Sequence, residues 1–159
     1  MLSLAVPSLI LLAGVVDDLR SRKVHNELVL VCLVVALIFC LYEGGLAGIG
    51  AGFLGLAAAV LMTLPLVLFG ALGAGDMKIF MAFGMAATWE ASVSVGIAAL
   101  IWGLVFGVIR AIIAGQFKAL MLNTIGIAAR KPAGELHRIP YTVALFMGWL
   151  TYLADGRIS

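Results

Sequence analysis

The 159 residues are 64% hydrophobic and only 11% charged, whereas a soluble domain carries about 25% charged residues. This balance excludes a water-soluble fold, and a net charge of +2 without a basic stripe argues against nucleic-acid binding. Because the mean hydropathy of +1.21 extends along nearly the whole chain, we expect one all-α, polytopic membrane helix bundle over residues 1–159.

Uncharged runs map six expected transmembrane helices, since a helix needs about 20 apolar residues to cross the hydrocarbon core. The third run is too long for one span and too short for two, so we expect a helix near residues 48–70 and a glycine-rich loop at 71–75. The fourth run is short and must recruit Asp76 and Lys78 at one end and Glu90 at the other to cross. The runs are residues 1–16, 28–42, 44–75, 79–89, 91–109 and 139–154.

The N-terminal runs show neither a secretory signal nor a metal site. No Lys or Arg precedes the first apolar stretch, so we expect a retained first span. Cys32 and Cys40 lie in one apolar run without a CxxC motif or a nearby His. We expect both to be reduced packing residues, because a buried cysteine behaves as a small hydrophobe.

The basic residues indicate orientation, because cytoplasmic connections are enriched in Lys and Arg. The first, third and fifth connections hold all of the ten basic residues except Arg157. We therefore expect these connections on the cytoplasmic side of the inner membrane and both termini on the opposite side. The longest connection, residues 110–138, contains a segment at 116–129 that we expect to form an interfacial helix on the cytoplasmic leaflet.

Three aspartates fall on the cytoplasmic side of this map: Asp17 and Asp18 end the first span, and Asp76 opens the fourth. Ionisable groups at membrane depth are costly and are usually paired or face a wet cavity. Two convergent carboxyls suit acid–base chemistry, because close like charges leave one acid protonated while the other stays ionised. The ionised member can take a proton from water, and the protonated member can polarise a peptide carbonyl. This chemistry leaves open whether Asp17 or Asp18 is the first member.

Asp76 ends the turn Gly73-Ala74-Gly75-Asp76 and enters a helix. Glycines permit such a turn and let a substrate backbone approach the carboxyl, and the following helix amides can stabilise negative charge. Lys78 either favours an ionised Asp76 or only snorkels to the headgroups and sets topology. Asp18 alone could be a capping carboxylate neutralised by Arg20 or Arg22. Two such aspartates, one of them in a Gly-x-Gly-Asp turn, indicate a site.

These segments resemble the type IV prepilin peptidase family, polytopic aspartic enzymes with a Gly-x-Gly-Asp signature. Gly73-Ala74-Gly75-Asp76-Met77-Lys78 matches the second-aspartate segment of that family. The segment from Asp18 to Asn26 is similar to the first, in which an Asp is followed six residues later by Ile-Pro-Asn. Here Val24-His25-Asn26 replaces Ile-Pro-Asn, and the spacing favours Asp18 over Asp17. Arg138-Ile139-Pro140-Tyr141, which enters the last span, is also similar to the family pattern.

The resemblance implies a catalytic pair, a set of site-shaping residues, and neither a metal nor another cofactor. The catalytic residues would be Asp18 and Asp76, and the site-shaping residues Gly73, Gly75, Lys78 and Asn26. It implies an intramembrane endopeptidase that removes the short basic leader of a pilin-like (Flp/Tad) or preflagellin precursor at the cytoplasmic membrane boundary.

Larger members of the family carry a cytoplasmic insertion with Cys pairs and also methylate the new N-terminus. This chain resembles the short, peptidase-only form, so no separate methyltransferase domain is expected. The particular pilin, the oligomeric state, and a bacterial or archaeal source stay open. Two other functions stay open as well: a small proton-coupled transporter that uses the same aspartates as relay groups, and a pilus-assembly membrane protein without enzymatic activity.

Overall fold

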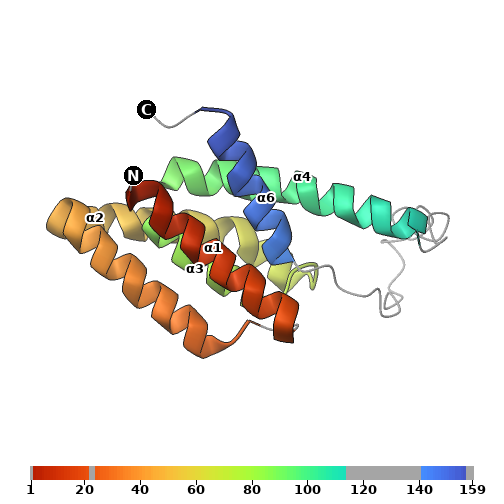
Figure 1. Cartoon of the computed structure of the whole chain (residues 1–159), viewed down its shortest axis with the longest axis horizontal. Helices are drawn as coiled ribbons and strands as arrows, with labels where there is room; N and C mark the ends of the chain where they lie inside the picture. Colours follow the sequence, from red (N-terminus) through yellow and green to blue (C-terminus); the bar gives the residue numbers. More distant parts are fainter. Residues whose placement is uncertain (1, 22–23, 114–140, 157–159) are drawn as a thin grey trace.

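The structure is a computed structural model that describes residues 2–21, 24–113 and 141–156 (Figure 1). Every regular element in these residues is an α-helix, in agreement with the predicted fold class. The interfacial helix predicted at residues 116–129 lies outside them and stays a prediction. The described residues form α1 (Leu2–Ser21), α2 (Asn26–Leu68), α3 (Ala74–Ala86), α4 (Trp89–Ile113) and α6 (Tyr141–Ala154).

Three of these helices are long and apolar enough to cross a membrane: α1, α2 and the part of α4 between Trp89 and Ile109. The apolar helix α6 is shorter, with 14 residues. Large apolar side chains are exposed along the long helices, as Leu9, Ile38 and Leu61 are at 63%, 61% and 72%. Soluble proteins rarely leave such continuous apolar surface in water. The helices therefore indicate a membrane protein.

The second and third predicted spans belong to one helical run, α2, which bends sharply at Gly45. Gly45 has φ 58° and ψ −139°, a conformation that residues with a side chain rarely adopt. Beyond the bend the chain returns beside itself (Figure 1), so that a Cβ on Gly48 would collide with the carbonyl oxygen of Cys40. The described residues thus form five helices rather than six, because a glycine bend, and not a polar loop, joins the two legs at 26–44 and 46–68.

α3 differs from the predicted fourth span at its far end. It includes Asp76 and Lys78 near its start, as predicted, but it ends at Ala86 and does not reach Glu90. Thr88 explains this end, because its hydroxyl accepts a 3.2 Å hydrogen bond from the amide of Ala91 and so caps α4. At about 1.5 Å per residue, α3 is about 20 Å long, which is shorter than the hydrocarbon core of about 30 Å.

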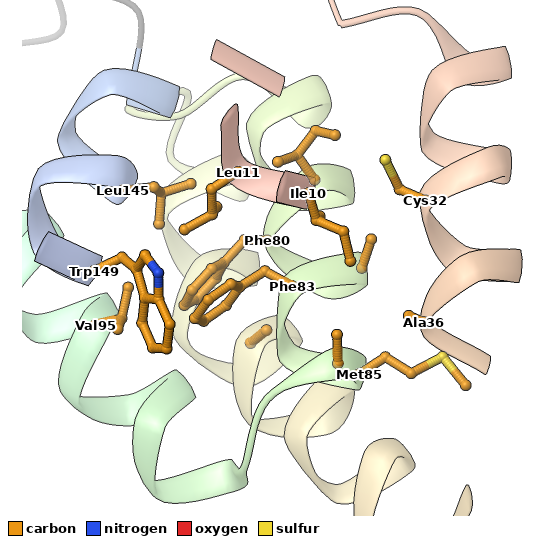
Figure 2. Packing of buried hydrophobic residues seen from close by; sticks show 14 of the residues in the cluster. Ile10, Leu11, Cys32, Ala36, Phe80, Phe83, Met85, Val95, Leu145 and Trp149 are labelled. Atoms are coloured by element: carbon orange, nitrogen blue, oxygen red, sulfur yellow. The ribbon is translucent and has the colours of Figure 1, made fainter. Parts of the chain in front are cut away.

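α3 lies at the centre of the bundle and contacts each of the other four described helices. Its Ile79, Phe80 and Phe83 have no exposed surface. Phe80 stacks on Phe83 with ring centres 5.7 Å apart, and Phe83 and Trp149 of α6 pack edge to face with ring centres 5.2 Å apart (Figure 2). This packing holds the helix that carries Asp76 against the rest of the molecule.

α2 and α3 approach each other through glycines. A Cβ on Gly55 would collide with the carbonyl oxygen of Gly84, and one on Gly84 would lie 2.5 Å from the carbonyl oxygen of Gly55. Small residues permit this approach of two backbones in membrane bundles. Cys32 and Cys40 are free and buried, as predicted, and the Cys40 thiol donates a 3.0 Å hydrogen bond to the carbonyl oxygen of Met85.

Candidate active site

Asp18 lies near the end of α1 and is turned into the bundle. It is 9% exposed, and it is the one charged residue in the buried class among the described residues. Its Oδ2 accepts a 2.8 Å hydrogen bond from the hydroxyl of Thr142, the second residue of α6, which is itself only 1% exposed. A hydrogen bond between side chains thus ties the end of α1 to the start of α6.

Asp76 lies in the first turn of α3, where negative charge is favoured by the unpaired amides of the helix start. The turn before it is extended at Gly73, the N-cap, with φ −75° and ψ 142°. A Cβ on Gly73 would lie 3.0 Å from Oδ2 of Asp76, so the carboxyl occupies the space that a side chain at position 73 would need. The role of Gly73 in shaping a catalytic site stays a prediction.

One contact fixes how α1 and α3 meet. A Cβ on Gly14 would lie 2.8 Å from Cγ2 of Ile79, so the side chain of Ile79 rests directly on the α1 backbone. Gly75, which precedes Ile79 on α3, contacts Val24, which follows Gly14 and lies just past the end of α1. The two helices therefore run antiparallel. Asp18 lies one turn after Gly14 on the same face of α1, and Asp76 lies about one turn before Ile79 on α3. The structure therefore brings both aspartates to the same end of the bundle.

The start of α6 lies beside both aspartates. Thr142 donates its hydrogen bond to Asp18, and Tyr141, the preceding residue, lies close enough to Asp76 for the carboxylate to act on its phenol electrostatically. In the sequence, Tyr141 stands out only as part of the segment that enters the last span, and Thr142 does not stand out. The signal available for Thr142 was weak: a hydroxyl in the first turn of an apolar run.

The other predicted site residues lie around the start of α3. Gly75 packs against Val24, because a Cβ at position 75 would lie 3.1 Å from the Val24 Cβ. Lys78 donates a 2.7 Å hydrogen bond from Nζ to Oδ1 of Asn26, the first residue of α2. Both contacts join the segment after α1 to the helix that carries Asp76.

Asp17, the alternative first aspartate, has different partners from Asp18. Its Oδ2 accepts a 2.8 Å hydrogen bond from the backbone amide of His25, and its Oδ1 lies 2.9 Å from Nδ1 of the same residue. The two neighbouring carboxyls thus bond to different elements, Asp17 to His25 before α2 and Asp18 to Thr142 in α6.

No group of three or more His, Cys, Asp or Glu residues that could hold a metal ion occurs in the described part of the chain. What the arrangement offers is a pair of carboxyls, one buried and one half-buried, at one end of an apolar bundle. Such a pair can exchange protons with water and with a peptide group.

Comparison with known proteins gives one match. No curated protein and no solved structure matches the chain. A family model described as the type IV leader peptidase family matches residues 5–108, well over half of the chain and a stretch that includes Asp17, Asp18 and Asp76. The helices, the aspartates at one end of the bundle and this match agree, and the chain belongs to the type IV leader peptidase family.

Proposed function

We propose that this protein is an aspartic endopeptidase with Asp18 and Asp76 as its catalytic pair. The observation that carries the proposal is the contact of Gly14 with Ile79, since each aspartate lies about one turn beyond it, towards the same end of the bundle. The family membership supports peptidase activity. The burial of Asp18 supports a role in the site, because a carboxyl away from water needs a partner or a function.

The mechanism needs one proton shared between the two carboxyls, because ionising both at close range is unfavourable. The ionised carboxylate takes a proton from water, and the water oxygen attacks the carbon of the scissile peptide group. The protonated carboxyl donates a hydrogen bond to the carbonyl oxygen, where negative charge develops. When the tetrahedral intermediate collapses, the C–N bond breaks and the amine leaves with the proton taken from water. The amides at the start of α3 favour the charged form of Asp76.

The proposed substrate is a pilin-like precursor of the Flp/Tad or preflagellin kind, from which the enzyme removes a short basic leader. The family description, which names leader peptidases of the type IV kind, supports this class. Because Gly73 has no side chain, nothing at that position covers Oδ2 of Asp76, which leaves an approach to the carboxyl for an extended backbone, whereas Val24 fills the space beside Gly75. We propose that Lys78 and Asn26, which are hydrogen-bonded to each other, border this approach.

We further propose that the site faces the cytoplasm at the inner membrane. If each leg of α2 and the short α3 cross the bilayer, six crossings result, and all basic residues except Arg157 lie on the side of the two aspartates. Both termini then lie on the opposite side. In this arrangement residues 1–159 act as one peptidase domain without methyltransferase activity.

The test uses the purified protein in detergent micelles with a pilin-like precursor that has a basic leader and an apolar helix. Release of the leader is followed by mass spectrometry. We expect Asp18→Asn and Asp76→Asn each to lower the cleavage rate by about 10²–10⁴-fold, because an amide cannot exchange the required proton. Glu90→Gln is the matched control, since Glu90 is an exposed acid at the start of α4, beyond the far end of α3. Cleavage by both Asn variants at the wild-type rate would exclude this mechanism, whereas a wild-type protein that cleaves no such precursor would favour a transport or assembly role.

A further inference from the structure

Asp17 and Asp18 are adjacent, yet the structure gives them separate tasks. Side chains of neighbouring helical residues point about 100° apart. Asp18 is buried and bonded to α6, whereas the side chain of Asp17 is 21% exposed and both of its oxygens face His25. A carboxyl whose two oxygens already accept hydrogen bonds from one residue is poorly placed to serve a substrate.

His25 gives Asp17 two hydrogen-bonding groups at a point where the chain changes direction. His25 is the N-cap of α2, with φ −73° and ψ 137°, and its side chain makes no capping hydrogen bond to that helix. Its ring instead lies 2.9 Å from Oδ1 of Asp17, and its backbone amide donates to Oδ2 at 2.8 Å. The end of α1 therefore holds both the backbone and the side chain of the residue that begins α2.

The residues on either side of His25 touch the start of α3. Val24 packs against Gly75, and Asn26 accepts a 2.7 Å hydrogen bond from Lys78. Residues 24–26, which we name the strap, thus contact α3 one residue before Asp76 and two residues after it. Through His25 the same strap is tied to the end of α1, one residue before Asp18.

We propose that Asp17 is a positioning residue. Its hydrogen bonds to His25, which we name the clamp, fix the strap, and the strap sets where Asp76 lies relative to Asp18. This inference rests on the proposed function only for its effect on catalysis. The mechanical part, in which Asp17 controls the contact between the strap and α3, stands on the hydrogen bonds alone. Asp17 does not touch substrate and exchanges no proton in the reaction.

A proline at position 25 offers a sharp test, because its ring can fix the backbone there without hydrogen bonds to Asp17. The φ of −73° at His25 lies within the range that a proline ring imposes, and proline has no amide hydrogen to satisfy. A proline at position 25 would therefore hold the strap without any acceptor at position 17. If Asp17 acts only through His25, His25→Pro should make the carboxyl at position 17 dispensable.

The first experiment measures cleavage of a pilin-like precursor by the full chain. We expect Asp17→Ala to lower kcat by about tenfold to hundredfold, as small misplacements of reacting groups do, with little change in KM. The double variant Asp17→Ala with His25→Pro should recover most of this loss. Asp17→Ala should stay well above the residual rate of Asp18→Asn. Failure of His25→Pro to rescue Asp17→Ala would overturn the proposal, as would an Asp17→Ala variant with the wild-type kcat.

The second experiment needs no activity. Asn26→Cys with Lys78→Cys places two exposed thiols where the strap meets α3, while Cys32 and Cys40 are buried. We expect a short bifunctional maleimide to join the pair and Asp17→Ala to lower the yield severalfold, with His25→Pro restoring it; the single-cysteine variants give the background. A yield independent of Asp17 would contradict the clamp. The catalytic proposal fails separately, if Asp18→Asn cleaves normally.

Discussion

In the middle of the bundle, α2 and α3 meet backbone to backbone at Gly55 and Gly84, and the rings of Phe83 and Trp149 pack edge to face. At the aspartate end, where Gly75 also packs against Val24, hydrogen bonds between single pairs of side chains join the helices. Thr142 holds Asp18 there, and Asn26 accepts a hydrogen bond from Lys78. The two regions lie only a few turns apart on α3.

This difference indicates that the middle of the bundle determines stability and that the aspartate end determines activity. Many atoms contribute to a packed contact between backbones, and none of them can move without disturbing several neighbours. A single hydrogen bond contributes little to folding but can set the position of one carboxyl. We therefore expect changes in the middle of the bundle to lower stability, and changes at the aspartate end to lower the rate of cleavage while the fold persists.

Gly55→Ala tests the middle of the bundle and should have the largest effect on stability. The added methyl would collide with the carbonyl oxygen of Gly84, which belongs to a helix backbone and cannot rotate away. We expect α2 and α3 to separate slightly and the free energy of unfolding to fall by about 3 kcal/mol, the upper end of the usual cost of overpacking. Unfolding in detergent micelles titrated with sodium dodecyl sulfate measures this loss.

Gly50→Ala is the matched control for this variant, because it makes the same change in the same helix. A Cβ on Gly50 would meet no atom within 4 Å. We expect this variant to be as stable as the wild type or slightly more stable, since alanine favours a helix by about 0.5–1 kcal/mol relative to glycine. Equal stabilities of the Gly55 and Gly50 variants would show that the close contact of α2 with α3 does not hold the bundle together.

Much of the fold could be predicted from the sequence, because its signals are local. Apolar runs predicted helices that correspond to α1, to the two legs of α2 and to α4, and a Gly-x-Gly-Asp turn predicted the start of α3. The bend at Gly45 could not be predicted, because the sequence does not show which of its 19 glycines adopts a positive φ. The early end of α3 had a signal in the sequence, because Thr88 is an N-cap residue just before the apolar run of α4. The length that a helix needs to cross the membrane favoured a longer α3 instead.

The candidate site could be predicted only in part, for a similar reason. Asp18 and Asp76 lie at the ends of apolar runs, and a charge in such a place is visible without a structure. The partners of the carboxyls are not visible, because Thr142 lies 124 positions from Asp18 and no pattern in either segment points to the other. The pairing of Asp17 with His25 is not visible either, because Val24-His25-Asn26 stands out through its spacing from Asp18 and its departure from the family pattern, and neither feature points to Asp17.

Thr142→Val tests the aspartate end and should lower cleavage more than stability. Valine keeps the shape of threonine but leaves Oδ2 of Asp18 without the hydroxyl that donates to it at 2.8 Å. A reacting carboxyl that loses this hydrogen bond is no longer held in place, so we expect a fall in kcat of about tenfold to hundredfold. A leader-release assay measures it, and Thr142→Ser, which keeps the hydroxyl, should retain most of the activity.

Thr151→Val makes the same substitution in the same helix, away from the aspartates. The Thr151 hydroxyl accepts a hydrogen bond from Trp102 and donates one to the carbonyl oxygen of Met147, so the change removes contacts without touching the candidate site. We expect an unchanged cleavage rate. A loss of cleavage in both threonine variants, in proportion to their loss of stability, would contradict the separation of the two regions.

Ser8→Ala sharpens the comparison with a single hydrogen bond in the middle of the bundle, and its expected effect is the smallest. The Ser8 hydroxyl accepts a 2.8 Å hydrogen bond from Nε1 of Trp149, which is only 2% exposed and would be left without this acceptor. We expect the free energy of unfolding to fall by about 1 kcal/mol, while the folded protein cleaves at the wild-type rate. Ser3→Ala, at an exposed position of α1, is the neutral control.

In a Trp149→Phe background, Ser8→Ala should hardly lower the free energy of unfolding, because the indole donor is already gone. A fall in the cleavage rate of Ser8→Ala at full folding would mean that single hydrogen bonds in the middle also control the site, and that the two regions differ in the number of their contacts rather than in their function.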